Sequence, residues 1–212
     1  MDIDSNIEQP SRSKADNAGG GSSGFLTRLV AGPGVSLLLM GLVSLGTWTG
    51  YQANNMDPFV LQSPLTEEWW QLPLSTFAHQ GPAHLYGNAI MIAIFGAIAV
   101  ISSSVLRYHI FFFLTGIASS VAHVMVTGAL GDASSVLGAS GAAMGLIGYV
   151  LVSNDISDLI LSRASWGVVV ILVLGLSLAL TLWSASLAVA NVSHFAGALI
   201  GVFAGYFHLL RS

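Results

Sequence analysis

The chain has 212 residues, of which 54% are hydrophobic and only 8% are charged, and its mean hydropathy is +0.76. Because soluble domains carry about 25% charged residues, this composition predicts an integral membrane protein. The formal net charge of −4 comes from a few scattered groups, which excludes a basic face for nucleic acid, and the sequence has no cysteine for a disulfide framework or thiolate chemistry.

The first 24 residues are polar and rich in Ser, Gly and Asn, and they end in a Gly/Ser run at 19–24. Such a segment buries too little apolar surface to order itself, so residues 1–24 are predicted to form a disordered tail. The tail lacks the apolar core of a cleavable signal peptide. We therefore expect the first long apolar segment to act as an uncleaved signal anchor, with residues 25–212 forming one membrane domain.

The rest of the sequence contains six apolar segments, and a helix of about 20 residues is enough to cross a bilayer. They predict an all-α, polytopic membrane protein built as a bundle of six transmembrane helices. The predicted spans are residues 34–53, 84–103, 106–128, 140–152, 166–188 and 192–210.

The cationic residues predict the orientation of this bundle, because Lys and Arg accumulate in cytoplasmic loops. With six spans, every Lys and Arg falls on one side of the membrane. Both termini are then cytoplasmic, the loops at 54–83, 129–139 and 189–191 face outward, and we expect the plasma (cell) membrane. The cations are Arg12, Lys14, Arg28, Arg107, Arg163 and Arg211.

The first outer loop mixes acids with aromatic residues, including Glu67, Glu68, Trp69 and Trp70. This mixture suits the membrane interface, so the loop is predicted to be partly helical and to lie on the bilayer surface.

Glycines at four-residue spacing mark faces where helices pack closely in membranes. They occur in the fourth and sixth predicted spans, at Gly141 and Gly145 and at Gly197, Gly201 and Gly205.

Four polar residues open the even-numbered spans, which all start on the outer side. His84 and Asn88 open the second span, Ser140 opens the fourth and His194 opens the sixth. Counting helical rise back from the cytoplasmic ends places Ser140 and His194 at similar depth, below the outer surface. The loop before Ser140 must then be buried in protein or line a water-filled cavity.

Ser at a helix start, flanked by Gly138 and Gly141, has a purely structural explanation as a helix cap. In a hydrated pocket Ser140 also has a chemical explanation, because a neutral imidazole nearby can activate its hydroxyl as a nucleophile. Ser140 is then the nucleophile and His194 the base. The side chains of His84 and Asn88 and the backbone N–H of Ser140 are candidate oxyanion donors. No acidic third member is evident, so a Ser-His dyad is predicted.

The sequence resembles the rhomboid intramembrane serine proteases in three segments. These are Ser75-Thr76-Phe77-Ala78-His79-Gln80-Gly81-Pro82-Ala83-His84-Leu85-Tyr86-Gly87-Asn88, then Gly138-Ala139-Ser140-Gly141, and His194-Phe195-Ala196-Gly197 followed by Gly201. The resemblance implies a six-helix rhomboid fold and cleavage of single-span membrane proteins without metal or cofactor. It also implies Ser140 as nucleophile, His194 as base, His84 and Asn88 at the oxyanion hole, and packing roles for Gly138, Gly141, Gly197 and Gly201.

The chain differs from common rhomboid patterns at three places. It has Trp70-Gln71 where many members have Trp-Arg, Met144 where some have Tyr, and Ser193 where Ala is common.

Two alternatives remain open at this point. One is a catalytically inactive relative that binds transmembrane segments, and the other is a metal transporter using His79, His84, His123 and His194. Of the remaining histidines, His79 is either a loop residue or a support for His84. His123 is expected to pack or hydrogen bond, and His109 and His208 to lie at the cytoplasmic interface. The expected partners are single-span transmembrane substrates and lipid, with no nucleic acid; the sequence does not specify an oligomeric state.

Overall fold

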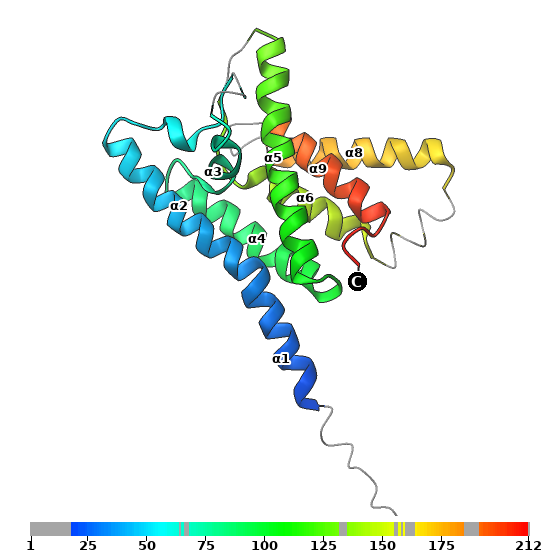
Figure 1. Ribbon diagram of the computed structural model, residues 1–212. Coiled ribbons are helices and arrows are strands. Elements are labelled where there is room, and N and C mark those ends of the chain that lie inside the picture. Colours follow the sequence, from blue (N-terminus) through cyan, green and yellow to red (C-terminus); the bar gives the residue numbers. More distant parts are fainter. Residues whose placement is uncertain are drawn as a thin grey trace, which may run out of the picture.

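In the computed structural model, every named element is a helix (Figure 1). The structure describes residues 18–63, 65, 68–131, 135–154, 157, 159, 164–184 and 191–211. The predicted all-α membrane bundle is confirmed over this part of the chain, while the count of six membrane crossings stays a prediction.

The first span belongs to a long helical rod made of α1 (Ala18–Leu29), a π-helical turn η2 (Val30–Gly34) and α2 (Val35–Gln52). Pro33 lies inside the π turn and has no N–H to donate, which interrupts the regular ladder. In the same turn, the carbonyl oxygen of Ala31 lies 2.7 Å from Nε2 of His109. Residues 18–24 of the predicted tail are helical, because a helix extends easily from a stable neighbouring turn, and residues 1–17 lie outside the described residues.

The first outer loop is partly helical, with η3 (Asp57–Phe59) and α3 (Gln71–Phe77). Gln71 is buried, and its side-chain amide donates to the carbonyl oxygen of Asp57 at 2.9 Å and to the carboxylate of Glu68. At the position where many rhomboids have Arg, a neutral amide thus ties two parts of this loop together.

The remaining apolar segments form helices close to their predicted positions. These are α4 (Pro82–Ser102), α5 (Val105–Ala129), α6 (Ser140–Val152), α8 (Trp166–Ser184) and α9 (Asn191–Tyr206). Residues 185–188 of the predicted fifth span lie outside the described residues.

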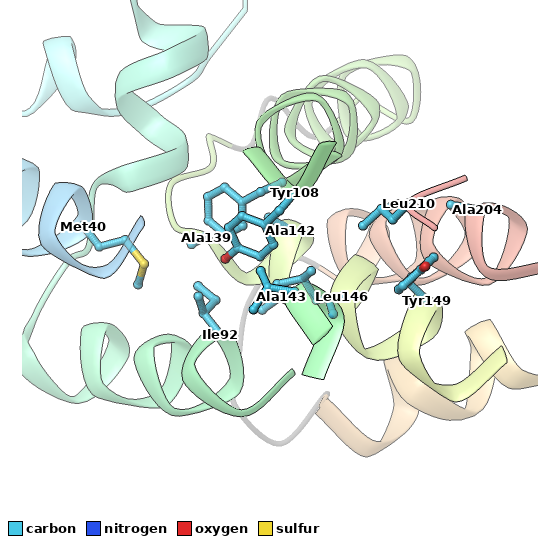
Figure 2. Packing of buried hydrophobic residues seen from close by; sticks show 13 residues of the cluster. Met40, Ile92, Tyr108, Ala139, Ala142, Ala143, Leu146, Tyr149, Ala204 and Leu210 are labelled. Carbon is cyan, nitrogen blue, oxygen red and sulfur yellow. The ribbon is translucent and has the colours of Figure 1, made fainter. Parts of the chain in front are cut away.

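Three helical stretches of the described chain are long and apolar enough to cross a membrane, namely Gly24–Gln52, α4 and α5. The 13-residue α6 is about 20 Å long, against a hydrocarbon core of about 30 Å. It occupies the interior of the bundle, and every residue from Gly141 to Tyr149 is buried. A helix that is apolar on all sides is typical of this position. Figure 2 shows its side chains Ala142, Ala143 and Leu146 gathered with residues from neighbouring helices.

The three described arginines lie at one end of the bundle and donate to backbone carbonyls there. Arg28 reaches Ile101 at 3.5 Å, Arg107 reaches Arg211, and Arg211 reaches Ser153 at 3.1 Å. This clustering agrees with the sequence-based grouping of the cations on one side. Arg12, Lys14 and Arg163 lie outside the described residues.

Candidate active site

Helices α6 and α9 are parallel neighbours whose backbones meet along a line of glycines. A Cβ atom at Gly197 would overlap the carbonyl oxygen of Gly141, and one at Gly201 would overlap that of Gly145. The third contact pairs Gly205 with the Tyr149 carbonyl oxygen, 2.8 Å from an added Cβ. Each step advances both helices by four residues, so the register is fixed, and only glycine permits this approach.

This register places Ser140 and His194 near each other along the helix axes. Ser140 is one residue before the Gly141–Gly197 contact and His194 is three before it, a difference of about 3 Å of helical rise. Both residues lie in the first turn of their helices, where Cβ atoms tilt toward the helix start. His194 is buried and Ser140 is half-buried.

The capping explanation for Ser140 does not describe its position, because Ala139 is the N-cap of α6 and Ser140 is the first helical residue. No side-chain hydrogen bond caps this helix at Ala139.

The loop before Ser140 lies against the start of α4. Gly138 has a φ of +118°, and a Cβ there would come within 2.8 Å of Cε1 and 2.9 Å of Nε2 of His84. The same hypothetical atom would lie 3.8 Å from Nδ2 of Asn88. The backbone N–H of Gly138 donates to the carbonyl oxygen of Ser75 at 2.8 Å, which fixes the loop to α3. The structure thus brings His84 and Asn88 to the backbone two residues before Ser140.

His79 supports this loop from the other side and is completely buried. Its Nδ1 lies 3.0 Å from the carbonyl oxygen of Phe77, so Nδ1 carries the proton. Its Nε2 is then an acceptor, and it receives the backbone N–H of Ala139 at 3.5 Å. Ser44 Oγ lies 3.1 Å from Nδ1, and the ring meets that of His84 edge-on with 5.0 Å between centroids. His79 thus lies in the loop between α3 and α4 and also contacts His84, which combines the two roles considered for it.

Burial, and to a lesser extent the proximity of His84, lower the pKa of His79 to about 3, while the bond to Phe77 opposes the shift. His79 is therefore neutral at pH 7 and can accept the Ala139 N–H.

Sequence reasoning missed several residues that shape this site. Ser119 of α5 and Ser193 of α9 fill the space beside Gly141, where a Cβ would meet their side chains. Trp48 donates its indole N–H to the carbonyl oxygen of His79 at 2.9 Å. His123 of α5, for which packing or hydrogen bonding was expected, is buried. Ser193 stood out in the sequence only as a departure from the common Ala, and its contact with Gly141 joins segments far apart in sequence.

Histidine and carboxylate side chains do not gather into any group of three or more able to hold a metal ion, within the part of the chain that the structure describes.

Comparison with known proteins agrees with this arrangement. The family model described as Rhomboid domain matches residues 66–211, which include all three segments of the site from Ser75 onward. None of the curated proteins matches the sequence. Since the match covers more than half of the chain, the protein belongs to the rhomboid family, which comprises intramembrane serine proteases and inactive relatives.

Proposed function

We propose that the chain is an intramembrane serine endopeptidase that hydrolyses peptide bonds in or near the outer end of single-span transmembrane substrates. One observation carries the proposal: the glycine contacts between α6 and α9 hold the helix starts with Ser140 and His194 at nearly the same level. Support also comes from His84 and Asn88, which lie against Gly138 immediately before the nucleophile.

In the proposed reaction, Oγ of Ser140 attacks the substrate carbonyl carbon while His194 takes the hydroxyl proton. The carbonyl oxygen becomes an oxyanion, for which the backbone N–H of Ser140 and the side chains of Asn88 and His84 are the donors. His194 then gives its proton to the leaving amine and the C–N bond breaks. Water hydrolyses the acyl-enzyme by the reverse proton transfers and restores both side chains.

The neighbouring contacts suit this chemistry because they hold the donors in place before substrate arrives. Asn88 donates through Nδ2 to the carbonyl oxygen of His84 at 3.2 Å, and an amide nitrogen has a second hydrogen to offer. His79 holds the Ala139 N–H next to the nucleophile. Fixed dipoles of this kind lower the reorganisation that a reaction requires.

The substrate helix would enter laterally from the lipid and unwind near its outer end, because helical backbone is hydrogen-bonded and shielded. Substrates with Gly near the outer interface should therefore be cleaved best. The first outer loop, the loop at 129–139 and α8 are the candidate gates. The same proposal includes six membrane crossings by residues 25–212, a cytoplasmic tail at 1–24, a cytoplasmic C-terminus and location in the plasma membrane.

The proposal is tested by cleavage of a single-span substrate with a Gly/Ala-rich outer juxtamembrane segment in proteoliposomes. The wild type should release a product that Ser140→Ala and His194→Ala do not. Ser177→Ala in α8 and His208→Ala after α9 are matched controls, and both should retain cleavage. Cleavage by Ser140→Ala would refute the nucleophile assignment, and no cleavage by the wild type over several substrates would favour an inactive relative.

A further inference from the structure

A groove of about 360 Å³ runs along the outside of the bundle between α5 and α9. Its walls come from α5 between residues 107 and 118 and from α9 with its following turn between residues 200 and 210. Apart from Arg107 and Thr115, the lining residues are apolar. The groove is separate from the candidate active site, since it ends beside Arg107 at the arginine-bearing end of the bundle.

The groove has the length of one lipid leaflet. Eleven residues of α5 separate Arg107 from Ala118, which corresponds to about 16 Å of helical rise. Half of a hydrocarbon core of about 30 Å is about 15 Å. The apolar walls therefore extend from the membrane surface to about the midplane, as an acyl chain of a single leaflet does.

The volume also favours an acyl chain over a helix. A helix about 10 Å wide and 16 Å long occupies about 1,250 Å³, several times the volume of the groove. A hydrocarbon chain of the same length and about 4–5 Å width occupies about 250 Å³, which the groove accommodates.

A cation lies at the end of the groove where a headgroup would be. Arg107 is exposed and uses Nη1 to donate to the carbonyl oxygen of Arg211, and a guanidinium has five N–H donors in all. The described residues at this end include three arginines and no carboxylate; the nearest acids in sequence, Asp155 and Asp158, lie outside them. Guanidinium binds phosphate through paired hydrogen bonds, which an anionic lipid headgroup can accept.

We propose that this groove is a binding site for an anionic phospholipid, with one acyl chain between α5 and α9 and the headgroup phosphate on Arg107. The lipid would contact the C-terminal half of α9, the helix that carries His194 in its first turn. The site is independent of the proposed protease chemistry, because none of the groove-lining residues belongs to the candidate active site.

Native mass spectrometry of the detergent-solubilised full chain tests the proposal, with phosphatidylglycerol and phosphatidylcholine of the same acyl chains as probes. The wild type should retain one phosphatidylglycerol about tenfold more tightly than phosphatidylcholine, the size expected for a charged hydrogen bond. Arg107→Gln should remove that preference, and Ala118→Phe, which fills the groove, should weaken binding of both lipids.

Two matched variants leave the groove unchanged and should bind like the wild type. Arg28→Gln removes an arginine at the same end of the bundle, and Ala93→Phe enlarges an exposed alanine on α4. Glycerol phosphate, which lacks acyl chains, should not displace the bound lipid at equal concentration. Equal retention of the two lipids by the wild type, or an Arg28→Gln effect as large as that of Arg107→Gln, would overturn the proposal.

Discussion

Helices α6 and α8 have similarly apolar sequences but opposite surroundings. All residues of α6 from Gly141 to Tyr149 are buried, whereas in α8 most described side chains are exposed and Val169 and Ser177 are buried. The difference lies in where small residues occur. The glycines of α6 touch backbone or side chains of α5 and α9, while Gly167 and Gly175 of α8 have no described atom within 4 Å of an added Cβ.

This contrast shows that hydropathy alone does not identify the core of a membrane protein. Lipid tails are as apolar as leucine, so close packing of small residues, and not apolar character, drives helices together. Helices α6 and α9 form a rigid support for the candidate dyad. Helix α8, by contrast, packs mainly on α9 and touches α6 only slightly.

The largest expected effect comes from replacing a packed glycine of α9 by alanine, compared with the same substitution at an exposed glycine of α8. Gly197→Ala forces α9 away from the Gly141 carbonyl oxygen and should lower the free energy of unfolding by about 3 kcal/mol, since backbone cannot easily yield. Gly175→Ala in α8 meets open space and should raise that free energy by about 0.5 kcal/mol, because alanine favours helix. Unfolding in mixed micelles measures both, and equal effects would contradict the account of α6 and α9.

Alanine substitutions at a second pair of glycines distinguish the cost of backbone strain from damage to the candidate active site. Gly138 and Gly131 both have positive φ, +118° and +81°, so alanine at either costs about 1–2 kcal/mol of strain. Only the Gly138 Cβ would collide with His84. Gly138→Ala should reduce kcat/KM for the test substrate about 100-fold, or about 2.7 kcal/mol, whereas Gly131→Ala should leave it within a few-fold. Similar losses in both variants would assign the effect to strain.

The buried, neutral His79 makes the stability of the fold depend on pH. Its pKa is about 3 in the folded protein, below the ordinary histidine value of 6.5, so the unfolded chain binds the additional proton as the pH falls. The contribution to stability is complete above pH 6.5 and declines toward pH 3, by up to about 1.4 kcal/mol per pH unit.

Thermal unfolding between pH 7 and pH 4 measures how steeply the free energy of unfolding falls with pH. His79→Gln should be less stable than the wild type at pH 7 and should show a shallower loss of stability with acid. An unchanged slope would mean that His79 is not the group responsible.

The smallest effect is expected at a single polar contact in the first outer loop. Gln71→Leu removes the amide that donates to Asp57 and should lower the free energy of unfolding by about 1–2 kcal/mol. The control is Gln52→Leu at the exposed end of α2, which should change it by less than about 0.5 kcal/mol. Comparable values for the two variants would show that the Gln71 contact is not an anchor.

The sequence predicts the helices well because their signals are local. The predicted 140–152 span coincides with α6, and the four-residue glycine spacing identifies the faces that meet in the structure. The start of α1 at Ala18 was not predicted, since it extends a helix whose apolar part begins later. The π turn around Pro33 was not predicted either.

The candidate site is only partly predictable for the same reason. Ser140, His194, His84 and Asn88 stand out because polar residues are costly within apolar spans. The bonds from Ala139 N–H to His79 and from Gln71 to Asp57 join residues that are not in one helix, and tertiary folding alone brings them together. The lipid groove likewise arises between α5 and α9, and neither helix sequence shows it.

The most direct test of the central claim is covalent labelling of the nucleophile in the membrane-reconstituted protein. A fluorophosphonate should form an adduct that tandem mass spectrometry locates on Ser140, and His194→Ala should abolish the labelling while His208→Ala retains it. Labelling of Ser119 or Ser193 in place of Ser140, or equal labelling after His194→Ala, would contradict a dyad held by the contact between α6 and α9.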